Sequence, residues 1–354
     1  MEENNDIIKN FFILGYDEIC ALLDNNRDVA TCYASHILPG DLLMEIIKEY
    51  QGKDDYSSIL KLFLSLEFKE ELHTRMEQAG SLTEQRISIE RVCIDIDVSD
   101  SRNNYKKFAK SIVELGNGVL GYRKPIIGQK QELMLNSDEN FVLIGGPGQG
   151  KSTICQFIAQ IYRAYYLCNI GERYEDARNF INEIENEYHY KIYCYRIPFK
   201  IVLREYAAWI NRQEQGENQS VIAYMRHRIN EIEAEKPSVK MIRKMLRELA
   251  WIFFFDGLDE VPESSNRKEV LKQIDNFITV ELREAKCDCI IIATTRAQGY
   301  NNDFDERRYR HVEVAELSKE VCLQYVEKLF GLIEERNENI CSVAGYKRIE
   351  EIYS

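Results

Sequence analysis

The chain has 354 residues, of which 45% are hydrophobic and 30% are charged, and its formal net charge is -13. This composition excludes a disordered chain, a collagen-like repeat and a small disulfide scaffold, and the length predicts about two domains. The net negative charge disfavours non-specific attraction to nucleic-acid phosphates or an anionic membrane, so we expect neither as a partner.

The ten cysteines indicate a reducing compartment. They are scattered singly apart from Cys287 and Cys289, and they form neither the paired C-x-x-C sets of a zinc site nor a short-loop disulfide framework. The first six residues are mostly acidic or amide-bearing, and no window approaches the apolar length of a membrane span. We therefore predict a cytoplasmic protein.

The N-terminal part of the chain reads as mostly helical. Apolar residues recur at helical spacing between residues 5 and 80, for example at Ile59, Leu60, Phe63 and Leu64. The pattern contains no recognisable chemical constellation. We predict a mostly helical N-terminal region over residues 1–115, of unknown role.

Residues 92–98 read V-C-I-D-I-D-V, and this strict alternation predicts a strand. It would place Ile94 and Ile96 on one face and Asp95 and Asp97 on the other. Two carboxylates on one face could bind a metal ion. A solvated face is the favoured interpretation, because the sequence places no third ligand.

A linker and an α/β domain follow. Gly116, Gly118, Gly121 and Pro125 punctuate the chain, and beyond residue 140 short β runs alternate with amphipathic helices. This alternation predicts a five-stranded parallel sheet flanked by helices, spanning residues 116–315. The predicted strands cover residues 141–144, 191–203, 251–255, 289–295 and 311–314.

A glycine-rich segment follows the first of these strands. Its sequence G-G-P-G-Q-G-K-S matches the phosphate-binding pattern G-x-x-x-x-G-K-[ST] between a predicted strand and an amphipathic helix. Glycines let backbone N–H groups wrap around phosphates, the lysine reaches the β and γ phosphates, and the serine hydroxyl coordinates Mg²⁺. The next residue, a threonine, lies near the α phosphate. The predicted nucleotide site comprises Gly145, Gly146, Pro147, Gly148, Gln149, Gly150, Lys151, Ser152 and Thr153.

An apolar run about a hundred residues later ends in Asp256, as expected where a buried strand presents a carboxylate to the metal ion. This is a Walker B segment. Asp259 and Glu260 follow just beyond the strand, where one of them could orient the water that attacks the γ phosphate. The strand over residues 289–295 leads into Arg296, which could reach the γ phosphate. We predict Ser152 and Asp256 as metal ligands and Glu260, Asp259 and Arg296 as catalytic residues.

Two other classes of function are alternatives to a slowly hydrolysing ATPase. A P-loop enzyme of another class would be a GTPase, a transporter ATPase or a nucleotide kinase; the sequence has neither the N-K-x-D motif of GTPases nor an L-S-G-G-Q-like transporter signature. A scaffold that binds nucleotide without turnover is disfavoured by the intact Lys151, Ser152, Asp256 and Glu260.

These motifs carry a family resemblance. The segments G-G-P-G-Q-G-K-S-T at 145–153, F-F-F-D-G-L-D-E ending at 260 and I-I-A-T-T-R at 291–296 resemble the NACHT family of STAND NTPases. Residues 196–207 are similar to its second strand, and residues 314–330 to the start of its helical lid. The resemblance covers residues 120–335 and is closest in style to bacterial antiviral, Avs-like proteins.

The resemblance implies a molecular switch that binds ATP and Mg²⁺ and hydrolyses ATP slowly, within bacterial antiphage defence. It also implies self-association of the full-length protein and a protein trigger recognised by a C-terminal sensor. Residues 316–354 would be the incomplete start of the lid domain. The chain ends at Ser354 before a winged helix or sensor, so we expect it to be truncated.

Overall fold

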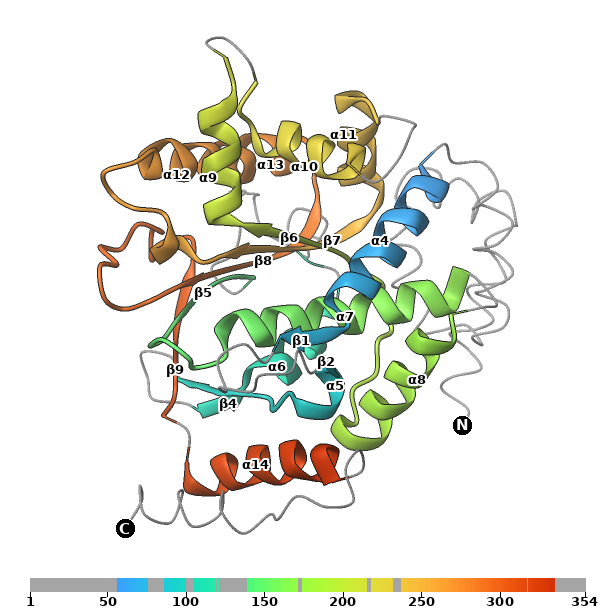
Figure 1. Ribbon diagram of the computed structural model, residues 1–354. Helices are drawn as coiled ribbons and strands as arrows, with labels where there is room; N and C mark the ends of the chain where they lie inside the picture. The colour runs from blue at the N-terminus through green and yellow to red at the C-terminus, as the bar shows by residue number, and fades with distance from the viewer. Residues whose placement is uncertain are drawn as a thin grey trace, which may run out of the picture.

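A computed structural model describes residues 56–75, 86–99, 105–118, 120, 139–170, 174–214, 218–231, 237–316 and 318–334. Its centre is a seven-stranded sheet in the order β4-β3-β9-β5-β8-β7-β6, with helices on both faces (Figure 1). The predicted strand count of five is corrected to seven. The five predicted strands form the parallel part of the sheet, and the two additional strands pair antiparallel at one edge. The seven strands are β3 (Asp97–Ser99), β4 (Tyr105–Lys107), β5 (Asn140–Ile144), β6 (Ile197–Val202), β7 (Ala250–Asp256), β8 (Asp288–Thr295) and β9 (Arg310–Val314).

The helices form one layer on each face of the sheet (Figure 1). On one face α7 (Lys151–Ile170) lies against the strands, flanked by α4 (Ser57–Glu71), α6 (Phe108–Gly116) and α8 (Glu175–Glu183). The other face carries α9 (Leu203–Arg212), α10 (Val221–Asn230), α11 (Val239–Glu248), α12 (Arg267–Asn276) and α13 (Leu282–Glu284). The remaining elements are β1 (His73–Arg75), β2 (Arg86–Ser88), α5 (Ile89–Val92), η2 (Ile184–Tyr188), η3 (Leu258–Glu260), η4 (Phe277–Glu281) and α14 (Lys319–Glu334).

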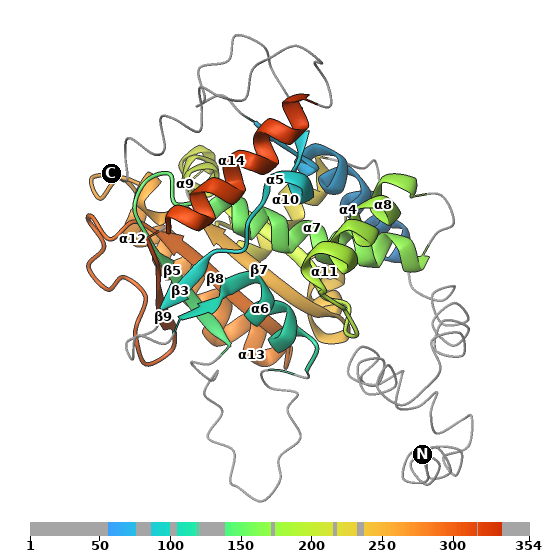
Figure 2. The ribbon, with the colours of Figure 1, turned by 90° about the horizontal axis from the view of Figure 1, so that it is seen from below.

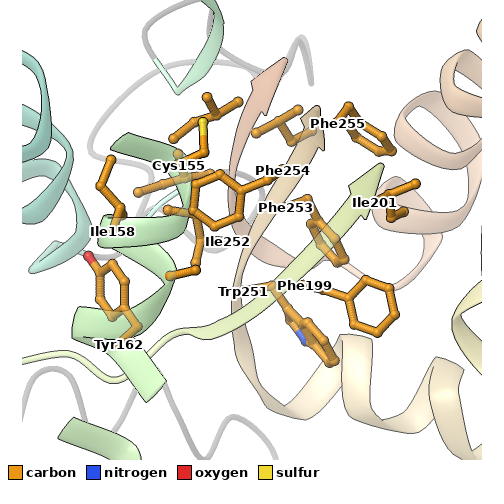
Figure 3. Close-up of a cluster of buried hydrophobic side chains, with 14 of the residues drawn as sticks. Cys155, Ile158, Tyr162, Phe199, Ile201, Trp251, Ile252, Phe253, Phe254 and Phe255 are labelled. Atoms are coloured by element: carbon orange, nitrogen blue, oxygen red, sulfur yellow. The ribbon is translucent and has the colours of Figure 1, made fainter. Parts of the chain in front are cut away.

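The central strands are apolar along most of their length because both of their faces are covered. Every residue of β7 and β8 is buried. Figure 3 shows how β7 serves two cores: Phe253 and Phe255 point to the side of Phe199, whereas Ile252 and Phe254 point toward α7. The helix that follows the P-loop thus packs against one buried face of β7.

Strands β3 and β4, at one edge of the sheet, and helix α4 come from the N-terminal part of the chain. β3 pairs with β9, and one continuous hydrophobic core includes residues from Tyr56 to Val314. The boundary near residue 116 and the role of residues 1–115 stay predictions. Within the described residues, however, elements on both sides of that boundary share a sheet. The predicted helical residues before residue 56 lie outside the described part of the chain.

The prediction of a strand over residues 92–98 with a solvated acidic face is wrong in two respects. Only the last two of these residues belong to β3, and Asp95 is buried at 6% exposure. Its carboxylate accepts hydrogen bonds from the backbone N–H groups of Ala109 (2.7 Å) and Lys110 (2.9 Å), at the start of α6, and from the Tyr190 hydroxyl (2.6 Å). Asp95 therefore satisfies helix donors that local sequence periodicity does not reveal. The described residues contain no cluster of three or more candidate metal ligands.

Arg196 directly precedes β6, at the amino ends of the parallel strands, and contacts the segment after α6. This side chain is fully buried and forms an ion pair with Asp288, with an Nη1–Oδ1 distance of 2.6 Å. It also donates to the carbonyl oxygens of Gly116 (2.8 Å) and Gly118 (2.7 Å). Asp288 in turn accepts from the backbone N–H of Leu120 (3.2 Å). One buried cation therefore connects the starts of two strands to residues 116–120.

Helix α14 lies beside α5, as the view from below shows (Figure 2). Lys328 on α14 donates hydrogen bonds to the carbonyl oxygen of Cys93 (3.2 Å) and to the Tyr188 hydroxyl (3.0 Å). The Tyr188 hydroxyl itself donates to the same Cys93 oxygen (2.6 Å). A helix is thus present within the predicted lid segment and contacts the N-terminal part of the core, whereas its role as a lid stays a prediction.

The buried carboxyl group of Glu90 predicts a pH-dependent stability. Burial, aided by the nearby charge of Glu183, raises its pKa from 4.5 to about 7. The folded protein therefore holds this proton more tightly than the unfolded chain, so the stabilisation is complete below pH 4.5 and is lost as pH rises through 7. We expect Glu90→Gln to stabilise the protein at pH 8 by about 2 kcal/mol and to have little effect at pH 4.5. Thermal unfolding at both pH values measures this, with exposed Glu70→Gln as control. An equal change in melting temperature at both values would contradict it.

Candidate nucleotide-binding site

The predicted site residues meet at the carboxyl edge of the parallel sheet. Residues 145–150 form the loop between β5 and α7, and Lys151, Ser152 and Thr153 begin α7. β8 lies between β5 and β7 in the sheet, so Arg296, which follows β8, lies between the P-loop strand and the strand that ends in Asp256. In open α/β sheets, ligands bind outside the carboxyl ends of the strands. The topology thus brings three sequence motifs to one place.

The P-loop has the backbone that its glycines predict. Gly148 and Gly150 have φ values of 74° and 76°, in the left-handed region that favours glycine. Lys151 folds back over the loop, and its ammonium group donates to the carbonyl oxygens of Gly145 (2.7 Å) and Gly146 (2.8 Å).

The electrostatics of the loop favour an anionic ligand. Lys151 is only 9% exposed. Burial lowers its pKa, opposed by the negative charge of nearby Asp259. The first turn of α7 contains no acidic residue, so its positive helix end is not neutralised there. A buried cation at a helix N-terminus is the arrangement that binds phosphate.

The two predicted metal ligands lie in direct contact. The Ser152 hydroxyl donates to Asp256 Oδ1 at 2.9 Å, although the two residues are 104 positions apart. Mg²⁺ binds oxygen octahedrally at about 2.1 Å, which places neighbouring ligands about 3 Å apart. The pair therefore fits two adjacent positions around Mg²⁺. Sites for Mg²⁺ commonly use one or two protein oxygens together with substrate phosphates and water.

The acids after β7 separate into two environments. Gly257, with a φ of 81°, turns the chain into the short helix η3, which carries Asp259 and Glu260. Asp259 Oδ2 lies 2.7 Å from Arg296 Nε, and its side chain is 15% exposed. Glu260 is 42% exposed, and its Oε2 lies 3.6 Å from an Nη atom of Arg204. Asp259 is therefore held by a close cation, whereas Glu260 is more accessible to solvent.

Sequence reasoning missed three residues of this site. The Thr294 hydroxyl donates to Asp256 Oδ1 (2.6 Å) and accepts from the Gly257 N–H (2.8 Å), so it holds the end of the Walker B strand. Arg204 is the second residue of α9, which begins directly after β6, and Arg267 begins α12. Of these three residues, only Thr294 could have been found from the local sequence, because strand alternation places it on the same face as Arg296.

Comparison with known families agrees with this geometry. Residues 141–316 match the model of the ATPase family associated with various cellular activities (AAA). This segment thus matches an AAA P-loop ATPase domain. The matched segment contains all of the predicted nucleotide, metal and catalytic residues, whose individual roles stay predictions.

Other comparisons are distant. No curated protein matches the chain. Among solved structures, PCH-2 of C. elegans aligns with 12% identity and a TM-score of 0.37, covering 66% of this chain and 47% of that one. The matched region thus spans less than half of PCH-2. Within the described residues, no helix is long and apolar enough to cross a lipid bilayer.

Proposed function

We propose that the AAA domain of this protein binds Mg²⁺-ATP and hydrolyses it slowly, as a nucleotide-controlled switch. The observation that carries the proposal is the 2.9 Å contact between Ser152 and Asp256. It joins the P-loop helix to the Walker B strand, with Lys151 beside them and two acids just beyond. A glycine-rich turn that served only as a connection would not need these groups together.

Each group has a task that its position allows. The loop N–H groups, the start of α7 and Lys151 bind the β and γ phosphates. Mg²⁺, held by Ser152 and Asp256, would neutralise charge on the phosphates. Glu260, the more accessible acid, orients the attacking water and takes its proton. Arg296, held by Asp259, can reach the γ phosphate from its place between the two motif strands.

The finer proposal is a switch of the NACHT type. Its support is the D-G-L-D-E segment, in which Gly257 separates the strand-end Asp256 from the acids of η3, and the position of α14 where the resemblance places a lid. From the same resemblance we propose a role in bacterial antiphage defence, with self-association and a protein trigger in the full-length protein. Base preference is tested by comparing ATP with GTP in the assays below.

Binding measurements with P-loop variants test the core of the proposal. Lys151→Ala removes a buried cation whose charge-assisted contacts to phosphate contribute about 1.5–3 kcal/mol. We therefore expect ATP affinity to fall by about 10- to 100-fold. Calorimetry on the parent and the variant measures this, and Lys272→Ala, which removes a lysine that is 72% exposed, serves as the matched control.

The assignment of Asp256 as a metal ligand is tested with Asp256→Asn, which keeps the shape of the side chain and removes its charge. We expect this variant to lose most of the Mg²⁺-dependent part of ATP affinity and to keep the Mg²⁺-independent part. Equal affinities of the Lys151→Ala protein and the parent would remove the P-loop assignment. Equal Mg²⁺ dependence of the Asp256→Asn protein and the parent would remove the metal assignment alone.

A further inference from the structure

Two separate loops carry the groups proposed to act on the γ phosphate. One is the η3 turn with Asp259 and Glu260, and the other follows β8 and begins with Arg296. One direct contact between them is the 2.7 Å ion pair of Arg296 and Asp259. That pair is partly exposed at Arg296, whose side chain is 46% exposed. Exposed ion pairs contribute little free energy, so this pair alone would hold the two loops only weakly at a fixed separation.

Arg267 supplies a second connection between the two loops. It is the first residue of α12 and is only 6% exposed. One Nη atom lies 3.5 Å from the carbonyl oxygen of Leu258 and 3.4 Å from that of Val261, which flank the acids of η3. The other lies 3.4 Å from the carbonyl oxygen of Gly299 and 2.7 Å from Asp303 Oδ2, both in the loop after β8. One guanidinium thus contacts both loops.

The position of Arg267 is costly for a cation. The N-terminal end of a helix carries a partial positive charge, which disfavours a cation there, and burial adds a desolvation cost. Asp303 offsets both, since its side chain is only 17% exposed and pairs directly with Arg267. The N-cap of α12 is the neutral Asn266, and a neutral residue at the next position would avoid the cost of a cation there. The planar fork of arginine, in contrast, can hold several acceptors in fixed directions, which lysine cannot do.

We propose that Arg267, with Asp303, is a positioning residue that sets the separation between Glu260 and Arg296 for attack on the γ phosphate. The inference rests on the proposed ATPase function. Arg267 acts through the backbone of both loops and through the Arg296–Asp259 pair. A displacement of about 1 Å in a catalytic group can cost about 100-fold in rate, whereas the P-loop, on other elements, would still bind ATP.

The test uses the whole chain and the variants Arg267→Lys and Asp303→Asn, each with its kcat, its ATP affinity by calorimetry and its melting temperature. Arg267→Lys keeps the positive charge and loses the planar guanidinium group with its several donors. Asp303→Asn keeps the shape of the side chain and provides a milder variant if Arg267→Lys folds poorly. We expect kcat to fall by about 10- to 100-fold in Arg267→Lys, with ATP affinity within about threefold of the parent. Arg243→Gln, which removes an exposed pair with Glu281, is the matched control and should leave kcat unchanged.

A double-mutant comparison separates positioning from general destabilisation. In an Arg296→Ala background, Arg267→Lys should reduce kcat by much less than in the parent, because part of its effect acts through Arg296. Equal reductions in both backgrounds, or parallel losses of kcat, affinity and melting temperature, would overturn the inference. Unchanged kcat in both Arg267→Lys and Asp303→Asn would also overturn it while leaving the ATPase proposal intact. A parent without Lys151-dependent turnover would remove the ATPase proposal and this inference together.

Discussion

Glu260→Gln is expected to lower the rate of ATP hydrolysis by about 10²- to 10⁴-fold while leaving ATP affinity within about threefold. The amide keeps the size of the side chain but cannot take a proton from water. Glu260 is the better candidate for this role because it is 42% exposed, whereas Asp259 is held 2.7 Å from Arg296. Binding should persist, since the phosphate-binding groups lie on the P-loop and on α7.

Single-turnover phosphate release on the Glu260→Gln protein, with calorimetry on the same preparation, measures both quantities. Glu284→Gln, an exposed change on α13, is the control and should behave as the parent does. Hydrolysis by Glu260→Gln at the parental rate would move the water-orienting role to Asp259. In that case Asp259→Asn should give the large loss instead.

Arg196→Met is expected to lower the free energy of unfolding by about 3–5 kcal/mol. The substitution leaves the carboxylate of Asp288 buried at 1% exposure without its cation. It also removes the donors to the carbonyl oxygens of Gly116 and Gly118. Unpaired buried charges and unsatisfied acceptors are among the largest single causes of destabilisation, so the effect should exceed that of any surface substitution.

Urea unfolding followed by circular dichroism measures the loss. Arg243→Met provides the contrast, because its pair with Glu281 is exposed at 52% on the arginine side and should contribute less than about 1 kcal/mol. Pairing Arg196→Met with Asp288→Leu should recover part of the stability, since the buried charge is then removed from both sides. Similar losses in the Arg196→Met and Arg243→Met proteins would contradict a structural role for the buried pair.

Local sequence patterns were enough to predict the class of fold, and they place the candidate nucleotide site on one contiguous loop. Both depend on contiguous residues: continuous apolar runs mark strands covered on both faces, and the glycine-rich loop needs its φ values at fixed positions such as Gly148 and Gly150. The acidic end of β7 likewise follows from a run that becomes a buried strand. For this reason five parallel strands and their motifs could be predicted from local patterns.

Which residues distant in sequence meet depends on how the elements pack together. Three-residue strands such as β3 and β4 are too short to be located by periodicity. β3 forms where β9 offers an edge to pair with, and β4 pairs in turn with β3. Asp95 alternates like a solvent-facing residue, yet the start of α6 packs over it and supplies hydrogen-bond donors. Arg267 reads as an ordinary polar residue at the start of a helix. Its contacts with two loops exist only because parallel strands end at one edge, where segments far apart in sequence must share their buried polar groups.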